Sequence, residues 1–522
     1  MMHIEINFNL PCPIVPMNVA ILNPSFGDDF VRVARWAAKS RGRVQRHPEY
    51  LLTAAQVLLD QGHDTLFVEA AARNLTPEEA FKICEDHRPG LLIIHATTPS
   101  IYNDIEQAKE IKLRTGCRVC FVGQHASAEA ENTFEIGRNV VDFIARGEYD
   151  HTVRDLADGV DPGKILGLTW WDSESLQAVK NPDRPPVDVN ELPFPAWQLI
   201  EPEWYPDGGK KFPFLTLITG RGCNNGCTFC RDPQIMYGYR LRNRTAKSVV
   251  DEMEYDLKIH PQVREIMFET DTFAADTQHV KEVCEEIMKR GLHKRISWSC
   301  NMRVNTDLEV LPLMRESGCR MLMTGFEFGY DDGLKAINKG GVSVDMARDY
   351  AHEANRLGFT IHGCFMIGAP GETRETAQQT IDFAKSLPLD TVQITGVASY
   401  PGTSLYKWAK ENEFLRADDW REWLNAQKEQ RTLLSYPQFS SEEIDEYIDR
   451  GLKEFYLRPK QMWKMLISIR SMGDLLRKLH GFKAFMDYFF KKIRSAFGST
   501  PPPTGPDKRV EEELRTGETV AL

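Results

Sequence analysis

The chain has 522 residues, with 64 Lys and Arg against 75 Asp and Glu, which gives a formal net charge of −11. At roughly 150 residues per domain, this length predicts about three domains. The composition, 42% hydrophobic and 27% charged, is that of a globular protein. The acid excess argues against a general nucleic-acid-binding protein, and no stretch approaches the roughly 18 uncharged apolar residues of a membrane span.

The cysteine content and the start of the chain favour a cytoplasmic protein. The first residues lack a basic segment followed by a long apolar one, so no signal peptide is predicted. Eleven scattered cysteines do not resemble a secreted disulfide framework. In a reducing compartment, cysteines more often bind metals or take part in redox chemistry.

The N-terminal part of the chain alternates apolar runs with amphipathic stretches. Its predicted strands are 17–22, 64–70, 89–96, 117–123 and 141–147. This alternation predicts that residues 1–160 form an α/β domain with a doubly wound parallel sheet. Ligands of such sheets bind at the carboxyl ends of the strands, so the loops that follow the strands are candidate binding loops.

The remaining chain divides into four segments. Residues 161–213 are rich in Pro, Gly and Asp, which predicts a linker with little regular structure. Residues 214–430 contain six further β/α repeats, which predict a full or partial (β/α)6 barrel. Residues 431–498 are predicted to be helical, and 499–522 to be a disordered tail. The predicted barrel strands are 214–220, 264–270, 295–301, 319–328, 359–368 and 391–397.

Three cysteines follow the first predicted barrel strand with C-x3-C-x2-C spacing: Cys223, Cys227 and Cys230. Three thiolates on one short loop can converge on one metal centre, and Gly222 and Gly226 let the backbone bend around it. Cysteine thiolates hold iron–sulfur clusters, normally four for a cubane, so three would leave one iron open to another ligand. The alternatives are an incomplete zinc site or three ordinary buried cysteines. A structural zinc site commonly uses two spaced pairs, and the loop that carries these three cysteines has no second pair.

With this motif the chain resembles the radical SAM superfamily, and Phe229 before the last cysteine matches its aromatic position. In that family the open iron binds the amino and carboxylate groups of S-adenosylmethionine (SAM). An electron from the cluster then cleaves SAM to a 5′-deoxyadenosyl radical. The resemblance implies a [4Fe–4S] cluster on Cys223, Cys227 and Cys230 as the catalytic, metal-binding residues. It also implies a reducing electron donor such as flavodoxin or ferredoxin.

Downstream segments extend this resemblance to the expected SAM site. Glu269 in REIMFETD lies where family members hold the methionine amine, and Arg303 in SWSCNMR lies toward the carboxylate. Glu327 in GFEFG is expected to accept ribose hydrogen bonds, although Phe328 replaces the usual small residue. Gly368 in HGCFMIGAPGET marks the turn that packs against adenine. Ordinary packing of barrel strands is the alternative for each segment.

The N-terminal block resembles the cobalamin-binding domain of B12-dependent radical SAM enzymes, and the whole resemblance covers roughly residues 1–460. No histidine has Asp two positions before it, so the D-x-H-x-x-G signature is absent and no lower axial ligand to cobalt is marked. No G-x-G-x-x-G follows the first strand, which disfavours a dinucleotide. Another nucleotide, or loss of the ligand, remains an alternative. The expected cobalamin contacts are Asn23, Thr97, Thr98, Gly123, Gln124, Gly147 and Glu148.

Residues 460–494 contain nine Lys and Arg but only two acids, together with many bulky apolar residues. We favour a helix that packs over the barrel with its basic face in water. The alternative is peripheral contact with an anionic membrane surface or access to a lipid-like substrate.

Together these features predict a cytoplasmic, cobalamin-dependent radical SAM enzyme that acts on a small-molecule or lipid-like substrate and not on nucleic acid. The favoured reaction is methyl transfer to an unactivated carbon through the 5′-deoxyadenosyl radical and methylcobalamin. The first alternative is oxidative ring formation without net methylation, as in the anaerobic magnesium-protoporphyrin ester cyclase group. The second is a non-catalytic iron–sulfur or corrinoid carrier.

Overall fold

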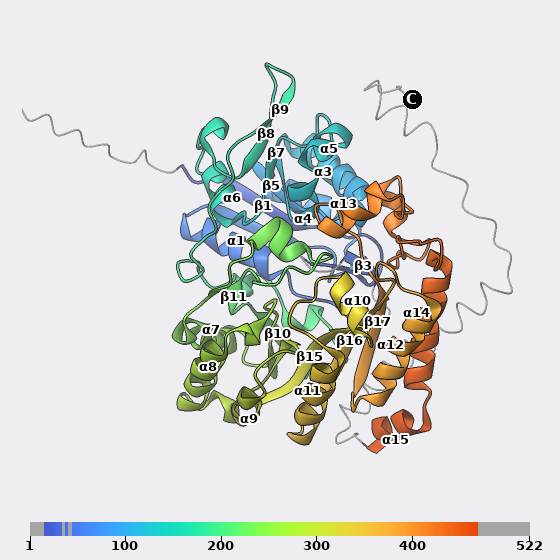
Figure 1. Ribbon diagram of the computed structural model, residues 1–522. Helices are drawn as coiled ribbons and strands as arrows, with labels where there is room; N and C mark the ends of the chain where they lie inside the picture. The colour runs from blue at the N-terminus through green and yellow to red at the C-terminus, as the bar shows by residue number, and fades with distance from the viewer. Residues whose placement is uncertain (1–14, 34–36, 40–43, 468–522) are drawn as a thin grey trace, which may run out of the picture.

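The computed structural model describes residues 15–33, 37–39 and 44–467. The fold of this part of the chain is organised around two large sheets. In Figure 1 the N-terminal sheet, in blue and teal, lies above the barrel sheet, in green and yellow. This arrangement confirms the predicted α/β class, with an N-terminal parallel sheet, a barrel region and C-terminal helices.

The N-terminal sheet has seven strands in the order β4-β1-β5-β6-β7-β8-β9. They are β1 (Asn18–Asn23), β4 (Asp64–Glu69), β5 (Leu91–His95), β6 (Arg118–Val122), β7 (Phe143–Ala145), β8 (Leu168–Asp172) and β9 (Gln177–Lys180). The first five strands pair in parallel, as the alternating sequence predicts.

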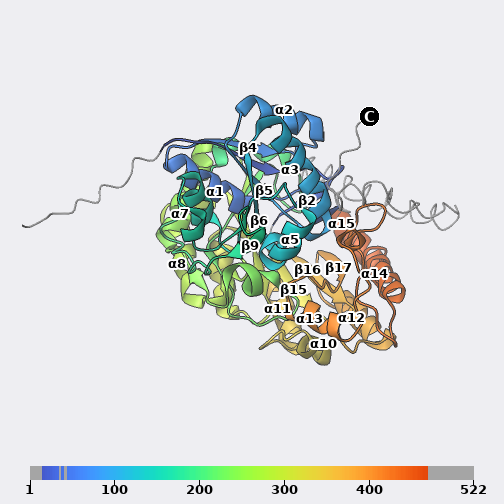
Figure 2. The ribbon, with the colours of Figure 1, turned by 90° about the horizontal axis from the view of Figure 1, so that it is seen from above.

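Helices cover both faces of this sheet. On one face, α1 (Glu49–Asp60) and α6 (Asp150–Ala157) pack against the odd-numbered residues of β1. On the other, α2 (Pro77–His87) and α3 (Ile101–Thr115) pack against the even-numbered ones. Figure 2 shows the strands running between α1 and α3. Because helices exclude water from both faces of the sheet, a ligand can approach only at the strand ends.

The expectation of little regular structure over 161–213 is wrong for β8 and β9. Both strands pair antiparallel, β8 on β7 and β9 on β8, and so extend the N-terminal sheet. The Pro and Gly residues on which the expectation was based flank this hairpin, and of the Asp residues only Asp172, at the end of β8, lies inside it. A second unpredicted hairpin, β2 (Phe30–Arg32) with β3 (Ala37–Lys39), follows β1.

The barrel sheet has six parallel strands in the order β10-β13-β14-β15-β16-β17. All six match predicted strands: β10 (Phe214–Leu217), β13 (Glu265–Phe268), β14 (Ser297–Arg303), β15 (Cys319–Glu327), β16 (Thr360–Ile367) and β17 (Thr391–Gly396). The main helices between them are α7 (Ala246–Ile259), α8 (Thr277–Lys289), α9 (Leu311–Glu316), α10 (Asp331–Ala336), α11 (Val344–Arg356) and α12 (Arg374–Ser386). The strand order ends at β10 and β17, so the barrel is partial.

The C-terminal helices are α13 (Ser404–Glu411), α14 (Ser441–Tyr456) and α15 (Pro459–Ile467). Residues 412–440 contain only one short 3-10 helix, so the helical prediction for 431–498 is wrong for 431–440. In α15, Lys464 donates to the carbonyl oxygens of Pro388 and Leu389, both at 3.1 Å, which holds this helix against the barrel. The rest of the basic segment 460–494 and the predicted tail 499–522 lie outside the described residues. Within the described part, every helix is too short or too polar to cross a bilayer.

Two ion pairs join the N-terminal sheet to the start of the barrel. Arg221 donates to both carboxylate oxygens of Asp150, at 2.6 and 3.2 Å, and both side chains are at most 5% exposed. The Arg221 guanidinium also lies over the ring of Tyr50, 5.2 Å from its centroid. Arg242 pairs with Glu148 nearby. Since a buried charge is tolerated only when paired, these contacts fix how the two sheets meet.

We expect Asp150→Asn to lower the free energy of unfolding by about 3 kcal/mol, because it leaves the Arg221 charge buried without a counter-ion. Denaturant unfolding followed by circular dichroism measures this change. Asp161→Asn is the control, since that exposed carboxylate forms an ion pair with exposed Lys164. Asparagine keeps the oxygen that accepts from the Gly163 N–H, so a change below about 0.5 kcal/mol is expected. Equal effects of the two substitutions would contradict the proposed importance of the buried pair.

Candidate functional site

The three motif cysteines lie on the loop that follows β10 and the short strand β11 (Gly220–Arg221). Cys223 and Cys227 are buried, and Cys230 is partly exposed. Gly222 has a φ of +87°, and a Cβ atom at this position would lie 2.2 Å from the carbonyl oxygen of Arg240. The turn into Cys223 therefore requires glycine.

The amide of Gln234 shapes the bend that carries the cysteines. Its Nε2 donates to the carbonyl oxygens of Cys227 at 3.1 Å, Thr228 at 3.2 Å and Cys230 at 2.7 Å. Its Oε1 accepts from the backbone N–H of Ser404 at 2.8 Å. One side chain thus ties three carbonyls of the loop to the start of α13. Sequence reasoning missed Gln234, because no motif signals this contact.

Polar hydrogens point at two of the sulfurs. Asn225 Nδ2 lies 3.4 Å and Thr272 Oγ1 3.9 Å from Cys223 Sγ. An Arg303 guanidinium nitrogen lies 3.7 Å from Cys227 Sγ. Hydrogen-bond donors, one of them a cation, therefore surround two of the three sulfurs.

The third cysteine has a different environment. Burial, followed by the nearby charges of Asp232 and Asp271, raises the pKa of the Cys230 thiol. Among the described residues, no three His, Cys, Asp or Glu side chains are close enough together to ligate a single metal ion. A cubane differs from a single ion because each thiolate binds a different iron atom, so its cysteine sulfurs lie farther apart.

The carboxyl ends of β13 and β14 hold the predicted SAM residues Glu269 and Arg303. Glu269 follows β13 and is partly exposed. Arg303 ends β14 and donates to the carbonyl oxygen of Gly340 at 3.0 Å. Since Arg303 also reaches Cys227 Sγ, the structure brings this predicted residue together with the cysteine loop.

Glu327 forms a buried ion pair with Lys339. Its backbone φ is +65°, and the register between β15 and β16 shifts between Gly325 and Glu327. This irregularity turns the carboxylate toward Lys339, which no motif had identified. The segment LKAINKG contains this lysine, but its spacing alone does not reveal the pair. Phe328, which departs from the family pattern, is fully buried.

Gly368 directly follows β16 (Thr360–Ile367), and Phe229 lies in the cysteine loop. Gly368 has a φ of +100°, its N–H donates to Glu372, and its carbonyl accepts from the Tyr436 hydroxyl at 3.0 Å. Burial raises the pKa of Glu372 to about 7. Phe229 is partly buried and packs against the main hydrophobic core.

The predicted cobalamin contacts at the ends of β1 and β5 lie together on the carboxyl edge of the N-terminal sheet. Asn23 Nδ2 donates to both carboxylate oxygens of Glu69, at 3.0 and 3.1 Å. Thr97 follows β5, and the next residue, Thr98, forms a 3.2 Å hydrogen bond with Nδ1 of His125. Gly123, at the end of β6, has a φ of +103°.

The other predicted contacts face the barrel. Gln124 Nε2 donates to Asp232 Oδ1 at 2.7 Å. Glu148 pairs with Arg242, and Gly147 forms the turn before it with a φ of +61°. These loops of the N-terminal sheet therefore touch the segments on either side of the cysteine loop.

Four buried polar atoms at the carboxyl edge of the N-terminal sheet have no hydrogen-bond partner within the described residues. They are Oδ1 of Asn23, Nδ1 of His95, Oε1 of Gln124 and Nε2 of His125. Burial lowers the pKa of both histidines to about 3, so the imidazoles are neutral. Buried polar atoms without partners are rare and mark places for a polar ligand or ordered water. The amide-rich periphery of a corrinoid fits this edge.

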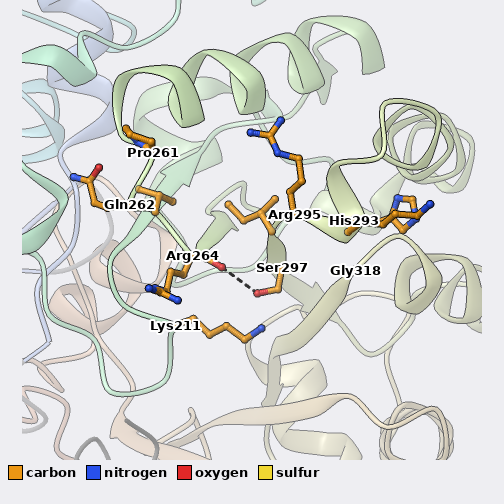
Figure 3. Close-up of a pocket in the computed structure, with 11 residues that line it drawn as sticks. Lys211, Pro261, Gln262, Arg264, His293, Arg295, Ser297 and Gly318 are labelled. Carbon is orange, nitrogen blue, oxygen red and sulfur yellow. Dashed lines mark hydrogen bonds between the residues drawn. The ribbon is translucent and has the colours of Figure 1, made fainter. Parts of the chain in front are cut away.

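A separate cavity of about 520 Å³ lies at the opposite end of the barrel, where the strands begin. Lys211, Arg264, His293, Lys294 and Arg295 contribute its basic groups. Figure 3 shows Lys211 and Arg264 on one side, with Arg295 and His293 directed elsewhere, so these groups do not converge on one point. The cavity is therefore distinct from the cysteine site.

Comparison with known proteins agrees with this geometry. Residues 217–384 match the model of the radical SAM superfamily. An uncharacterized methyltransferase from Pyrococcus horikoshii is 31% identical over 414 residues, which cover 78% of this chain and 87% of the relative. The anaerobic magnesium-protoporphyrin IX monomethyl ester cyclase of Rubrivivax gelatinosus is 25% identical, covering 66% of this chain and 62% of the relative.

Solved structures share the fold. The radical SAM methyltransferase TsrM from Kitasatospora setae, with cobalamin and a [4Fe–4S] cluster bound, superposes with a TM-score of 0.67 at 17% identity. The match covers 90% of this chain and all of TsrM. The cobalamin-dependent radical enzyme OxsB superposes with a TM-score of 0.61 at 16% identity, covering 96% of this chain and 70% of OxsB. With the sequence relatives, these matches show that the chain belongs to the radical SAM superfamily, in the family whose barrel follows a cobalamin-binding-type domain.

Proposed function

We propose that this chain is a cobalamin-dependent radical SAM methyltransferase that transfers a methyl group to an unactivated carbon. The observation that carries the proposal is the contact between the two strand-end edges. Gln124, after β6, donates to Asp232, which lies two residues beyond Cys230. A substrate carbon must meet both cofactors in this reaction, and juxtaposed edges supply that proximity.

Membership of the superfamily implies a [4Fe–4S] cluster and SAM. When bound, the cluster supplies the electron that cleaves SAM. Cys223, Cys227 and Cys230 would hold it, with Asn225 and Arg303 donating toward two of the sulfurs.

The SAM site is proposed at the carboxyl ends of the barrel strands. Glu269 would bind the methionine amine, and Arg303 would orient the carboxylate. Glu327 would accept from the ribose hydroxyls, while Lys339 fixes its carboxylate. Gly368, in its left-handed conformation, would let the backbone approach adenine.

Cobalamin, which supplies the methyl group when bound, is proposed at the carboxyl edge of the domain formed by residues 1–160. The unpartnered atoms of Asn23 and His125 support this placement. Thr97 and Thr98 would contribute small side chains beside the ligand, and Gly123, which has no side chain, would let the backbone approach it. Gln124, Gly147 and Glu148 would act from the side that contacts the barrel.

The domain boundaries proposed earlier need one change within this scheme. The first domain extends through β8 and β9 because both strands belong to its sheet. Residues 214–430 remain the proposed radical SAM barrel. A small-molecule substrate and a protein reductant complete the proposed reaction.

We expect that replacing Cys223, Cys227 and Cys230 together by alanine abolishes the brown absorbance and most of the bound iron, about four atoms per chain for a cubane. Anaerobic reconstitution followed by iron analysis and electron paramagnetic resonance measures this loss. Cys364→Ala, which removes another partly exposed cysteine, should keep both signals. Iron retained in the triple variant would end the assignment.

Lys339→Met is expected to weaken SAM binding roughly tenfold, because the Glu327 carboxylate loses the partner that orients it. The change that SAM causes in the cluster's paramagnetic spectrum reports the dissociation constant. Lys335→Met is the control, since that lysine forms only an exposed pair with Asp332. An unchanged dissociation constant for SAM in Lys339→Met would contradict the proposed role of Lys339 in the SAM site.

A labelling experiment tests methyl transfer itself. The reduced, cobalamin-loaded enzyme is incubated anaerobically with a deproteinised cell extract and methyl-deuterated SAM. We expect 5′-deoxyadenosine and a product that carries the labelled methyl group. Formation of 5′-deoxyadenosine with an unlabelled product would favour the ring-forming alternative, and absence of 5′-deoxyadenosine would favour the carrier.

A further inference from the structure

Residues 415–434, which we call the strap, lie between α13 and α14. The backbone of Leu415 bridges to Leu434, and that of Leu424 to Gln430, so the segment folds back on itself. The short helix η9 (Trp420–Trp423) lies inside the strap. In Figure 1 the orange chain beyond α13 reaches the level of the N-terminal sheet.

The strap contacts loops that follow neighbouring strands of that sheet. After β1, the Lys428 ammonium donates to the carbonyl oxygen of Phe26 at 3.3 Å and lies over its ring. Beyond β5, the Tyr102 hydroxyl donates to Asp419 at 2.8 Å. The strap therefore spans the ends of β1 and β5, the pair between which the strand order reverses and where ligands of such sheets bind.

Trp420 makes the contacts beyond β6. Its indole N–H donates to Asn132 Oδ1 at 2.7 Å. Its ring meets that of His125 edge-on, with centroids 5.1 Å apart. His125 is also the partner of Thr98, so Trp420 closes over two of the loops proposed to bind cobalamin.

The other side of the strap is attached to the barrel beside the cysteine loop. Trp423 lies 5.0 Å from Trp420 between ring centroids and forms a separate buried cluster with Tyr400 and Leu433. The guanidinium of Arg231, the residue after Cys230, lies 3.9 Å from the Tyr400 ring centroid. Ring contacts and this apolar cluster together connect the cysteine loop to the carboxyl edge of the N-terminal sheet.

Three buried polar atoms along this set of contacts lack partners within the described residues. They are Nε2 of His125, Nε1 of Trp423 and Oγ of Ser399. None of these side chains is more than 3% exposed. Leaving such groups unpaired costs about 1–3 kcal/mol each, so a polar partner at any of these atoms would stabilise the protein.

We propose that the strap is the outer wall of the cobalamin site and that Trp420 retains the bound cofactor. This inference rests on the cobalamin part of the proposed function. The amide groups around a corrinoid can both donate and accept hydrogen bonds, which matches the mixed set of unpartnered atoms. Buried ordered waters are the competing occupants, and they predict no role for Trp420 in cofactor retention.

The test measures how fast bound cobalamin leaves the full-length protein. Wild type and variants are reconstituted anaerobically, loaded with hydroxocobalamin and mixed with excess radiolabelled cobalamin to follow exchange. We expect Trp420→Ala to release cobalamin roughly tenfold faster than wild type. Trp408→Ala is the matched control, because this equally half-buried tryptophan packs on Phe414 and Tyr436, away from the N-terminal sheet. It should exchange at the wild-type rate.

Trp420→Phe keeps an aromatic ring but removes the hydrogen bond to Asn132 and part of the indole surface, so about threefold faster exchange is expected. This variant decides the matter if Trp420→Ala does not fold, as judged by its cluster signal. Wild-type exchange in a folded Trp420→Ala, or in Trp420→Phe when Trp420→Ala is unfolded, would overturn the inference. A wild-type protein that holds its cluster but no cobalamin would instead refute the cobalamin part of the proposed function.

Discussion

The buried ion pair between Asp150 and Arg221 is the contact on which the rest of the site depends. In a parallel sheet all loops at the carboxyl ends of the strands share one edge, and this protein has two such edges. Asp150 begins the helix after β7, and Arg221 precedes the first motif cysteine by two residues. The pair therefore brings the strand-end loops of one sheet directly to the cysteine loop of the other.

Much of the fold follows from local pattern. The alternation of apolar and amphipathic stretches predicts all six barrel strands and the five parallel strands of the first sheet, because each needs only its own burial to be recognised. The hairpin β8–β9 was missed because prolines and glycines on either side of it obscured a short edge segment. The cysteine motif was visible because its three ligands are close in sequence.

The parts of the site that sequence did not reveal depend on long-range contacts. Gln234 binds the cysteine loop and Ser404, 170 residues away, and Gln124 reaches Asp232 across 108 residues. Lys339 finds Glu327 only because the strand register shifts before it. No periodicity in the sequence predicts such long-range contacts. The residue types at the strand ends, in contrast, identify candidate binding residues from the sequence alone.

The hairpin of β8 and β9 has a consequence for how the molecule behaves among its own copies. It places a four-residue strand, with Lys180 at its end, at the margin of the first sheet. A short edge strand that carries a charge disfavours pairing with a strand of a second molecule. Without this hairpin, the margin would be β7, whose three residues are all buried and apolar. By pairing with β7, the hairpin covers an apolar strand through which the protein could otherwise aggregate.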